Sequence, residues 1–338
     1  MPDNGMRALV KRSRSPRDVA VIDWRRPVPS AGEVLVRTDA VGLCGSDVHA
    51  WNQDIGYEWV ARSVVLGHEA VGVVTEVGSD VDPGWIGQRV VPISIDGCGE
   101  CDVCATGRRH ICPRRQVLGL SFHGAAADCF TVAAQRLVVV PDDLPVQALV
   151  LTEPLAIAMH AVSKLQDAAQ GRASEIVVTG PGPIGLMAAL LLDSFGHRVT
   201  LVGIARDQPV RLAAAAKLGL QTSQGEDLPL APDMWLEASG SGEALDRAVR
   251  QTAIGGAVVV PAVFARIPTV DINVVTRHEL HLLGSYGASR EDYERAAVIL
   301  QRDPGRWDGL TTSFPLDQGV DALRAVEQGS VVKAILLP

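Results

Sequence analysis

The spacing of hydrophobic positions changes about halfway along the chain. Over the first 150 residues, apolar and polar side chains alternate in short runs separated by glycine and other turn residues, as in residues 33–42 (EVLVRTDAVG) and 70–78 (AVGVVTEVG). A period of two is typical of half-buried β-strands. This part of the sequence therefore predicts an all-β region of short strands.

A different pattern begins near residue 152, where apolar residues recur at helical spacing over residues 152–166. From residue 175 onward, short apolar β-branched runs alternate with amphipathic segments that end in glycine. The predicted strands are 175–180, 197–203, 234–240, 257–264 and 280–286, and the predicted helices are 183–196, 207–219 and 241–252. Strands that alternate with helices of this length predict a parallel, doubly wound sheet covered on both faces.

The last fifty residues have a helical segment at 291–302 and a final amphipathic stretch at 331–338, with no glycine motif or cysteine cluster of their own. We expect this tail to return to the first region and complete it. The predicted organisation is an α/β protein of two domains, the first made of residues 1–155 and 289–338 and the second of residues 156–288.

Length and charge narrow the class of protein. The 338 residues exceed the size at which one hydrophobic core stops growing, which agrees with two domains. The formal net charge is -8, with 39 acidic and 31 basic side chains, so a nucleic-acid partner is not expected. The sequence lacks a long charge-free apolar stretch and an apolar N-terminal signal core, which predicts a cytoplasmic protein with no membrane span.

A glycine-rich turn stands between the strand at 175–180 and the helix that opens with Pro183 and Ile184. Its glycines, Gly180, Gly182 and Gly185, form the pattern G-x-G-x-x-G. In a dinucleotide site the first glycine permits the tight turn, the second lets the backbone approach the pyrophosphate and the third allows close packing of helix and strand. The alternative is an ordinary strand-to-helix turn, but its position favours a nucleotide site.

The residues after the next strand bear on the choice of cofactor. An NAD-selective site places an acidic residue there for the ribose 2′-hydroxyl, whereas this chain has Gly203, followed by Arg206 and Arg211. Arginines at this place suit a 2′-phosphate, so NADP is favoured over NAD. The alternatives are that Asp207 serves NAD after a shift of register, or that the arginines are only solvated.

Four cysteines are crowded into one loop with the spacing C-x2-C-x2-C-x7-C: Cys98, Cys101, Cys104 and Cys112. Four thiolates within fifteen residues can close a tetrahedral zinc shell with no open position, so this metal would be structural. An iron–sulfur cluster and a redox-active pair are the alternatives, but nothing else in the sequence indicates electron transfer.

A second set of metal-type side chains is scattered, with Cys44 and His49 in one segment, His68 and Glu69 in another, and Glu153 at the start of a helix. Each has an ordinary structural explanation, since single buried cysteines and hydrogen-bonded histidines are common and an acid favours a helix N-terminus. Their spacing alone does not group them into a site.

The motifs together resemble one known family. GLCGSDVH (42–49), LGHEAVGVVTEVG (66–78), the four-cysteine loop, TEPLA (152–156) and VVTGPGPIGL (177–186) occur in the order found in medium-chain zinc-dependent alcohol dehydrogenases. The similarity extends from residue 6 to the C-terminal strand. Glu153 makes the chain most similar to the polyol, sugar and threonine dehydrogenase branch, in which a glutamate replaces a cysteine at the catalytic zinc.

This resemblance implies a GroES-like, twisted β-barrel catalytic domain joined to a Rossmann cofactor domain, with two zinc ions per chain. Cys44, His68 and Glu153 would hold the catalytic zinc, and Glu69 would be a fourth or exchanging ligand. By the same resemblance, the substrate oxygen would be contacted by Ser46 and the proton relayed by His49. The family also implies a homodimer or homotetramer.

The expected activity is hydride transfer between a nicotinamide cofactor and a small secondary alcohol or ketone, most similar to a polyol or sugar. An aldose dehydrogenase, a dedicated biosynthetic reductase and a non-catalytic cofactor-binding relative are the alternatives. Residues between His49 and Gly67, where substrate selection is expected, match no specific substrate signature. Asp47 and Cys129 are expected to be structural.

Overall fold

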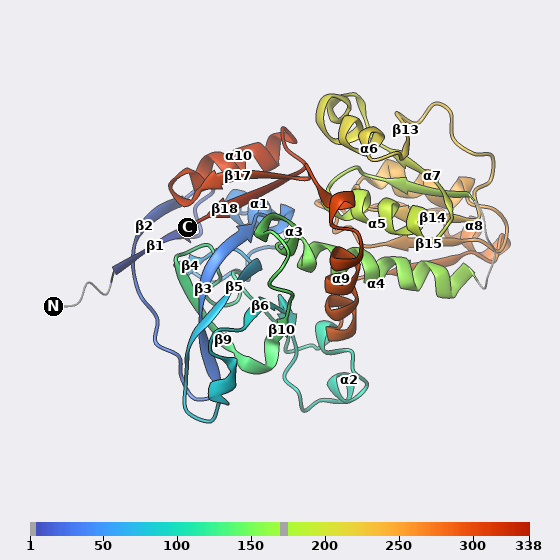
Figure 1. Ribbon diagram of the computed structural model, residues 1–338. Coiled ribbons are helices and arrows are strands. Elements are labelled where there is room, and N and C mark those ends of the chain that lie inside the picture. Colours follow the sequence, from blue (N-terminus) through green and yellow to red (C-terminus); the bar gives the residue numbers. More distant parts are fainter. Residues whose placement is uncertain (1–4, 170–174) are drawn as a thin grey trace. The chain divides into compact units, whose positions relative to one another are not determined.

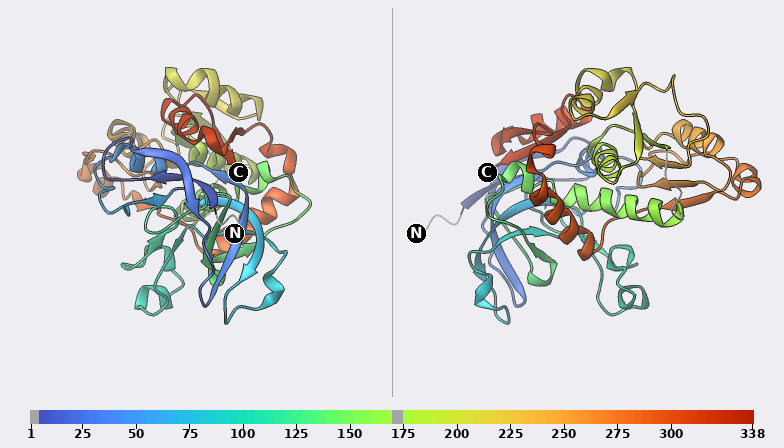
Figure 2. Two further views of the ribbon diagram at one scale, coloured as in Figure 1. Left: turned by 90° about the vertical axis from the view of Figure 1, so that its left-hand side faces the viewer. Right: turned by 45° about the vertical axis from the view of Figure 1, so that its right-hand side comes forward.

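The computed structural model describes residues 5–169 and 175–338. Contacts within the chain divide it into two compact units, one made of Met1–Glu153 and Ser289–Pro338 and the other of Pro154–Ala288 (Figures 1 and 2). The second unit is therefore inserted, in sequence, into the first. Each unit is described by itself.

The first unit is built on a seven-stranded sheet in which β10, β6, β5, β3, β18 and β17 follow one another and β9 also pairs with β3. Its pairs are antiparallel except for β17 and β18. A three-stranded sheet (β2-β1-β4) and the pair β7-β8 complete the unit. The bounds are β1 Gly5–Lys11, β2 Val19–Arg25, β3 Glu33–Gly42, β4 Val64–Val65, β5 Glu69–Val77, β6 Arg89–Pro92, β7 Ile95–Asp96, β8 Gln116–Val117, β9 Cys129–Ala133, β10 Leu137–Val139, β17 Thr311–Pro315 and β18 Lys333–Leu337.

Helices interrupt the all-β pattern predicted for the first region. The most important is α1 (Gly45–Asn52), which begins directly after Cys44 because the side chain of Asp47 accepts a hydrogen bond from the backbone N–H of Cys44 at 2.8 Å. Such a capping interaction starts a short helix without a long amphipathic pattern. The other α-helices of this unit are α2 Asp102–Ala105, α3 Val146–Leu149, α9 Arg290–Arg302 and α10 Gly319–Gln328.

The second unit contains a six-stranded, fully parallel sheet with the order β13-β12-β11-β14-β15-β16. Sequential strands therefore run outward in both directions from β11, which is the doubly wound order of dinucleotide-binding folds. The predicted fold class is confirmed. Its elements are α4 Thr152–Ala169, β11 Glu175–Thr179, α5 Pro183–Ser194, β12 Arg198–Val202, α6 Ala213–Lys217, β13 Gln221–Ser223, β14 Met234–Glu237, α7 Gly242–Gln251, β15 Ala257–Val260, α8 Ile272–Arg277 and β16 His281–Gly284.

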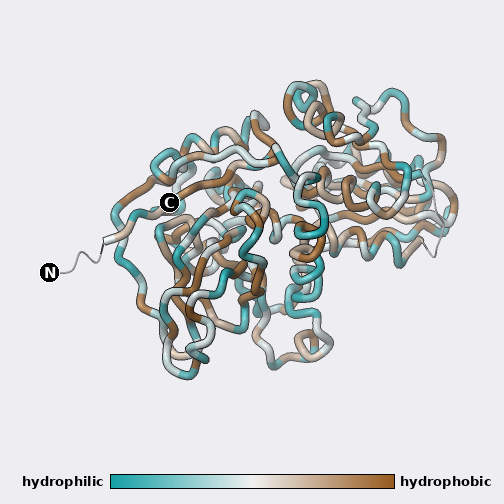
Figure 3. Tube along the Cα trace, in the orientation of Figure 1, coloured by the Kyte–Doolittle hydropathy of each residue, from teal (hydrophilic) through white to brown (hydrophobic). Residues whose placement is uncertain are grey.

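Burial explains why these strands form. The central strands β11 and β14 are almost wholly buried, and their continuous apolar sequences are typical of parallel strands covered on both faces. Figure 3 colours the chain by hydropathy, and in this sheet β11 (EIVVT) and β14 (MWLE) are mainly hydrophobic. Their packing holds the carboxyl ends of the strands, where the glycine turn lies, in a fixed position.

The segment predicted as one helix over residues 207–219 is more irregular. It begins with a short 3₁₀ turn at Ala205–Asp207, continues as a π-helical turn at Gln208–Leu212 and only then becomes α6. Pro209 lies in the first turn, where its missing N–H is tolerated, and Asp207 accepts a hydrogen bond from the backbone N–H of Ile204 at 3.0 Å. This irregular start carries the arginines considered for cofactor selection.

One helical stretch is apolar and long enough by composition to cross a membrane, namely Val146–Ala169. However, 72% of its most apolar window is buried inside the protein. A helix covered in this way has the burial of a core helix, and its hydrophobicity is accounted for by packing.

Candidate active site and metal centres

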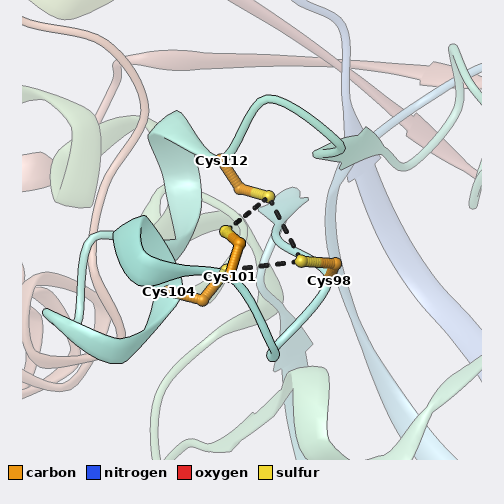
Figure 4. Close-up of side chains that lie close together, drawn as sticks. All are labelled: Cys98, Cys101, Cys104 and Cys112. Carbon is orange, nitrogen blue, oxygen red and sulfur yellow. Dashed lines mark hydrogen bonds between the residues drawn. The ribbon is translucent and has the colours of Figure 1, made fainter.

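The sulfur atoms of Cys98, Cys101, Cys104 and Cys112 converge on one point (Figure 4). The Sγ–Sγ separations are 3.9 Å for Cys98–Cys104, 3.7 Å for Cys101–Cys112 and 3.6 Å for Cys98–Cys112. Ligands placed at the usual Zn–S distance of about 2.3 Å around a tetrahedral ion lie about 3.8 Å apart. These separations are too long for disulfides and fit a closed tetrahedral metal site.

Local backbone geometry shapes this loop around the sulfurs. A Cβ atom on Gly97 would lie 2.6 Å from the Cys104 sulfur, so only glycine fits there. Backbone N–H groups of Gly99 and Arg114 donate to the sulfurs of Cys104 and Cys112 at 3.4 and 3.3 Å. Such donors stabilise thiolates, the form of cysteine that binds metal.

The loop is fastened to the first unit through Asp96. Arg109 donates to its two carboxylate oxygens at 2.5 and 2.7 Å, and Arg136, which is buried, lies 3.5 Å from the same carboxylate. This bidentate, charge-assisted contact holds the loop at both its beginning and its end.

A second group of ligand atoms lies in the interior of the first unit. The donor atoms of Cys44, His68 and Glu69 all lie within 4.8 Å of one another, and His68 and Glu69 are buried. The Oε1 atom of Glu69 has no hydrogen-bond partner in the part of the chain that the structure describes. A thiolate, an imidazole and a buried carboxylate oxygen without a partner are the donor set expected of a zinc site with an open position.

Two glycines and one aspartate create this group. A Cβ atom on Gly42 would lie 2.3 Å from the carboxylate of Glu69, and Gly67, which precedes His68, has φ +88°. Asp47 is fully buried, accepts from the N–H groups of Cys44 and Gly67 at 2.8 and 3.3 Å, and lies 3.7 Å from Nδ1 of His68. Asp47 therefore ties the two ligand-bearing segments together, and burial raises the pKa of its carboxyl.

Glu69 also has a charged partner that the sequence did not reveal. Lys333, on β18, forms an ion pair with Oε2 of Glu69, and both side chains are almost completely buried. The ammonium offsets the charge of a carboxylate that burial would otherwise penalise. The C-terminal strand thus supplies a cation to a site whose other residues come from residues 42–69.

Glu153 does not belong to the group formed by Cys44, His68 and Glu69. Its Oε1 atom accepts a hydrogen bond from Oγ of Ser94 at 2.6 Å and lies 3.5 Å from the hydroxyl of Tyr293. Burial, together with the nearby carboxylate of Glu69, raises the pKa of Glu153 to about 7. Glu153 is therefore a buried carboxyl group beside the donor cluster, held by two hydroxyl groups.

The two residues expected in proton transfer lie on α1. Oγ of Ser46 is 3.3 Å from Nε2 of His68, so it contacts the donor group directly. Nδ1 of His49 lies 2.7 Å from the Asp54 carboxylate, and its ring stacks on Tyr57 with 5.1 Å between the ring centroids. Pairing with Asp54 orients the imidazole and leaves Nε2 as the nitrogen that can exchange a proton.

In the second unit, the three glycines of the turn differ in how much space each leaves for a side chain. Gly180 has φ +91°, and a Cβ there would lie 2.6 Å from the backbone of Ser239. A Cβ on Gly185 would lie 2.0 Å from the carbonyl oxygen of Gly180, whereas a Cβ on Gly182 would meet nothing within 4 Å. The first and third glycines are thus required by packing, and the second leaves open space.

That open space belongs to a pocket of about 540 Å³ lined by the glycine turn, the ends of β12 and β13, and α7. Pro183 and Ile184 form the first turn of α5 and are not among the residues that line it. Glu237, at the end of β14, accepts hydrogen bonds from the N–H groups of Ser239 and Gly240 at 2.8 and 3.3 Å. It fixes the loop that forms the opposite wall.

The segment after β12 carries the residues considered for cofactor selection. Gly203 directly follows β12, and the carboxylate of Asp207 accepts a hydrogen bond from the backbone N–H of Ile204 and lies 3.6 Å from Arg211. Asp207 and Arg211 are both largely buried, whereas Arg206 is exposed. The pocket is lined by all four of these residues, Gly203, Arg206, Asp207 and Arg211.

Comparison with known proteins identifies the family. Residues 30–142 match the alcohol dehydrogenase GroES-like domain, and residues 183–302 match the zinc-binding dehydrogenase domain. The chain belongs to the zinc-dependent alcohol dehydrogenase family. The predicted family and fold are confirmed, so this protein is an oxidoreductase that uses zinc and a nicotinamide cofactor on a small alcohol or carbonyl substrate.

The relatives cover nearly the whole chain. An L-threonine 3-dehydrogenase from Chelativorans sp. (strain BNC1) is 33% identical over 97% of this chain and 98% of its own length. A sorbitol dehydrogenase from Halalkalibacterium halodurans is 30% identical over 98% and 99%. The crystal structure of an alcohol dehydrogenase from Escherichia coli CFT073 with NADH has a TM-score of 0.89, with 24% identity over 99% of this chain and 100% of that one, which shows the shared fold.

Proposed function

We propose that this dehydrogenase interconverts a secondary alcohol and a ketone on a small, hydroxyl-rich substrate of the polyol or sugar type, with NADP preferred over NAD. Relatives that act on sorbitol and on threonine support a substrate whose reacting hydroxyl has polar neighbours. The observation that carries the proposal is the buried donor group of Cys44, His68 and Glu69 in contact with Ser46.

Two zinc ions per chain are proposed. The four-cysteine loop would hold the structural one, and Cys44, His68 and Glu153 would hold the catalytic one, with Glu69 as a fourth or exchanging ligand. When bound, the catalytic zinc acts as a Lewis acid toward the substrate oxygen, and the nicotinamide supplies or takes the hydride. Glu69 supports this site because its carboxylate lies within 4.8 Å of the donor atoms of Cys44 and His68.

The protein's own residues would handle the proton. Ser46 offers a hydroxyl beside the donor group, and His49 offers Nε2 while Asp54 holds its Nδ1. In the direction of alcohol oxidation, Ser46 would accept the hydroxyl proton while passing its own proton on toward His49, whose Nε2 would release a proton to solvent. Lys333 would keep the charge of Glu69 balanced during these steps.

The proposed domain roles follow the same division. Residues 1–155 with 289–338 would form the catalytic domain, and residues 156–288 would bind the cofactor through Gly180, Gly182 and Gly185. We also infer a cytoplasmic homodimer or homotetramer assembled through β16, the edge strand of the six-stranded sheet, which light scattering would test.

The test is reduction of NADP+ and NAD+ by the zinc-loaded protein with simple alcohols, polyols, aldoses and threonine as substrates. We expect turnover with polyols or sugars, and loss of turnover in Cys44→Ser at unchanged fold, because a ligand of the open site is removed. Cys129→Ser is the matched control, because Cys129 lies in a β-strand outside both cysteine-containing donor groups. Turnover by a Cys44→Ser protein of verified metal content would refute the ligand assignment, and turnover confined to simple alcohols would refute the substrate class.

A further inference from the structure

Three arginines line the pocket of the second unit: Arg206 and Arg211 from the segment after β12, and Arg247 from α7. The sequence directs attention to the first two, because they follow the strand end at which cofactor selection is expected. The third lies more than thirty residues further along the chain and reaches the pocket only through the fold. Their surroundings differ, and the difference decides which of them can serve an anionic ligand.

The guanidinium of Arg211 already has a charged partner in the protein. It lies 3.6 Å from the Asp207 carboxylate, and only 15% of the Arg211 side chain is exposed. Within a buried ion pair of this kind, each charge is needed to offset the burial of the other. Arg211 is therefore paired with Asp207 and contributes little net positive charge to the pocket.

Two hydrogen bonds fix the guanidinium of Arg247 at the wall of the pocket. Its Nη2 donates to the carbonyl oxygen of Gly225 at 2.6 Å and its Nε donates to the side chain of Gln251 at 3.1 Å. Gly225 has φ +99°, and a Cβ there would lie 2.8 Å from Nη1 of Arg247, so only glycine lets the guanidinium come this close. Neither contact is with a carboxylate, so the positive charge of Arg247 is not neutralised by these partners.

We propose that Arg247, and not Arg211, is the second arginine that, together with Arg206, binds the 2′-phosphate of NADP. A phosphate monoester carries a charge of about -1.5 to -2 near neutral pH, so one exposed arginine does not balance it. A guanidinium fixed in orientation before binding loses less conformational entropy when it forms paired hydrogen bonds to phosphate oxygens. This assignment rests on the proposed preference for NADP.

Glu243 places a negative charge at the wall of the same pocket. It lies one helical turn before Arg247 on α7 and is exposed, and no ion pair joins the two within the described part of the chain. A carboxylate at this place repels a phosphate dianion and weakens its binding. Glu243→Gln should therefore tighten NADP+ binding, while Arg247→Gln should weaken it.

The test is calorimetric titration of the zinc-loaded full chain with NADP+, NAD+, adenosine 2′-monophosphate and adenosine 5′-monophosphate, which reads binding without turnover. We expect Arg247→Gln to weaken binding of NADP+ and adenosine 2′-monophosphate by about tenfold to hundredfold, and that of the other two ligands less than twofold. Arg247→Lys should fall between, because it keeps the charge but not the planar fork. Arg250→Gln, on the same helix but outside the pocket, is the matched control and should change nothing.

Different results would refute the preference for NADP and the role of Arg247. Wild-type protein that binds NAD+ as tightly as NADP+ would refute the cofactor preference itself. Wild-type protein that prefers NADP+ and loses the preference in Arg206→Gln but keeps it in Arg247→Gln would refute the role of Arg247 alone. Equal weakening of all four ligands in Arg247→Gln would show that Arg247 only supports the loop at Gly225, and would also overturn the assignment.

Discussion

Removal of one hydroxyl group, in Tyr293→Phe, tests the network that holds Glu153. The Tyr293 side chain, on α9, is 1% exposed, and its oxygen accepts from the backbone N–H of Ser94 at 3.0 Å. The same hydroxyl lies 3.0 Å from Oγ of Ser94, which in turn donates to Glu153 at 2.6 Å. Phenylalanine fills the same space but leaves the buried N–H of Ser94 without an acceptor.

The expected cost follows from that unpaired group. A buried donor that loses its partner destabilises a protein by about 1–3 kcal/mol. In a domain of this size each kcal/mol lowers the melting temperature by about 2–4 °C, so we expect a fall of about 2–12 °C. Ser94→Ala keeps the backbone N–H and its contact with Tyr293 but removes the donor to Glu153. The two changes should therefore not add in the double variant, because they remove parts of one network.

The assay is thermal and urea unfolding of the zinc-loaded protein at one pH. Thr276→Val is a suitable control, because its exposed hydroxyl only bonds to the carbonyl oxygen of Ile272 within α8, and its loss should change stability by less than about 0.5 kcal/mol. A Tyr293→Phe protein that melts within 1 °C of wild type, or effects of Tyr293→Phe and Ser94→Ala that simply add, would show that this network does not exist as described.

Two further predictions concern stability elsewhere in the first unit. Cys101→Ser should remove one zinc per chain and lower the melting temperature by more than about 5 °C, since structural zinc contributes folding free energy, and unchanged zinc content and melting would contradict the structural site. Lys11→Met should stabilise the protein by about 1–3 kcal/mol near neutral pH, because the buried Lys11 ammonium has no hydrogen-bond partner in the described part of the chain. Burial lowers the pKa of Lys11, opposed by Asp18, so the unfolded state binds the proton more tightly and the advantage of Lys11→Met should shrink as the pH rises toward 10.5; a gain that grows with pH would refute this.

The features that the sequence predicted well are those whose geometry is local. The glycines of the cofactor turn are spaced for three separate steric demands within six residues, and the structure imposes those demands on Gly180 and Gly185 while leaving Gly182 open. The four cysteines needed only one loop to converge. In both cases the residues are close together in sequence, and the chain has little freedom to place them far apart. Their spacing alone is therefore enough to predict that they lie together in the fold.

Contacts between distant segments could not be predicted in the same way. Lys333 and Glu69 are separated by most of the chain, and Lys333 is a single cation in an otherwise apolar strand, with no pattern around it to indicate a partner. Ser94 and Tyr293, 199 residues apart, are likewise ordinary polar residues in sequence. The pairing of Arg211 with Asp207 depends on the π-helical turn that follows Asp207, and periodicity does not indicate such a turn.

The pairing of the C-terminal strand has a consequence for biosynthesis. β18 lies between β17 and β3, with Ile335 opposite Gly42, so one neighbour of β3 is synthesised only after the whole inserted unit. The inserted unit, Pro154–Ala288, is synthesised before that strand and contains its own sheet. Nascent chains should therefore be able to complete the inserted unit before the larger sheet closes, and until then the end of β3 at Val41 and Gly42 lacks its β18 partner and presents an unpaired edge.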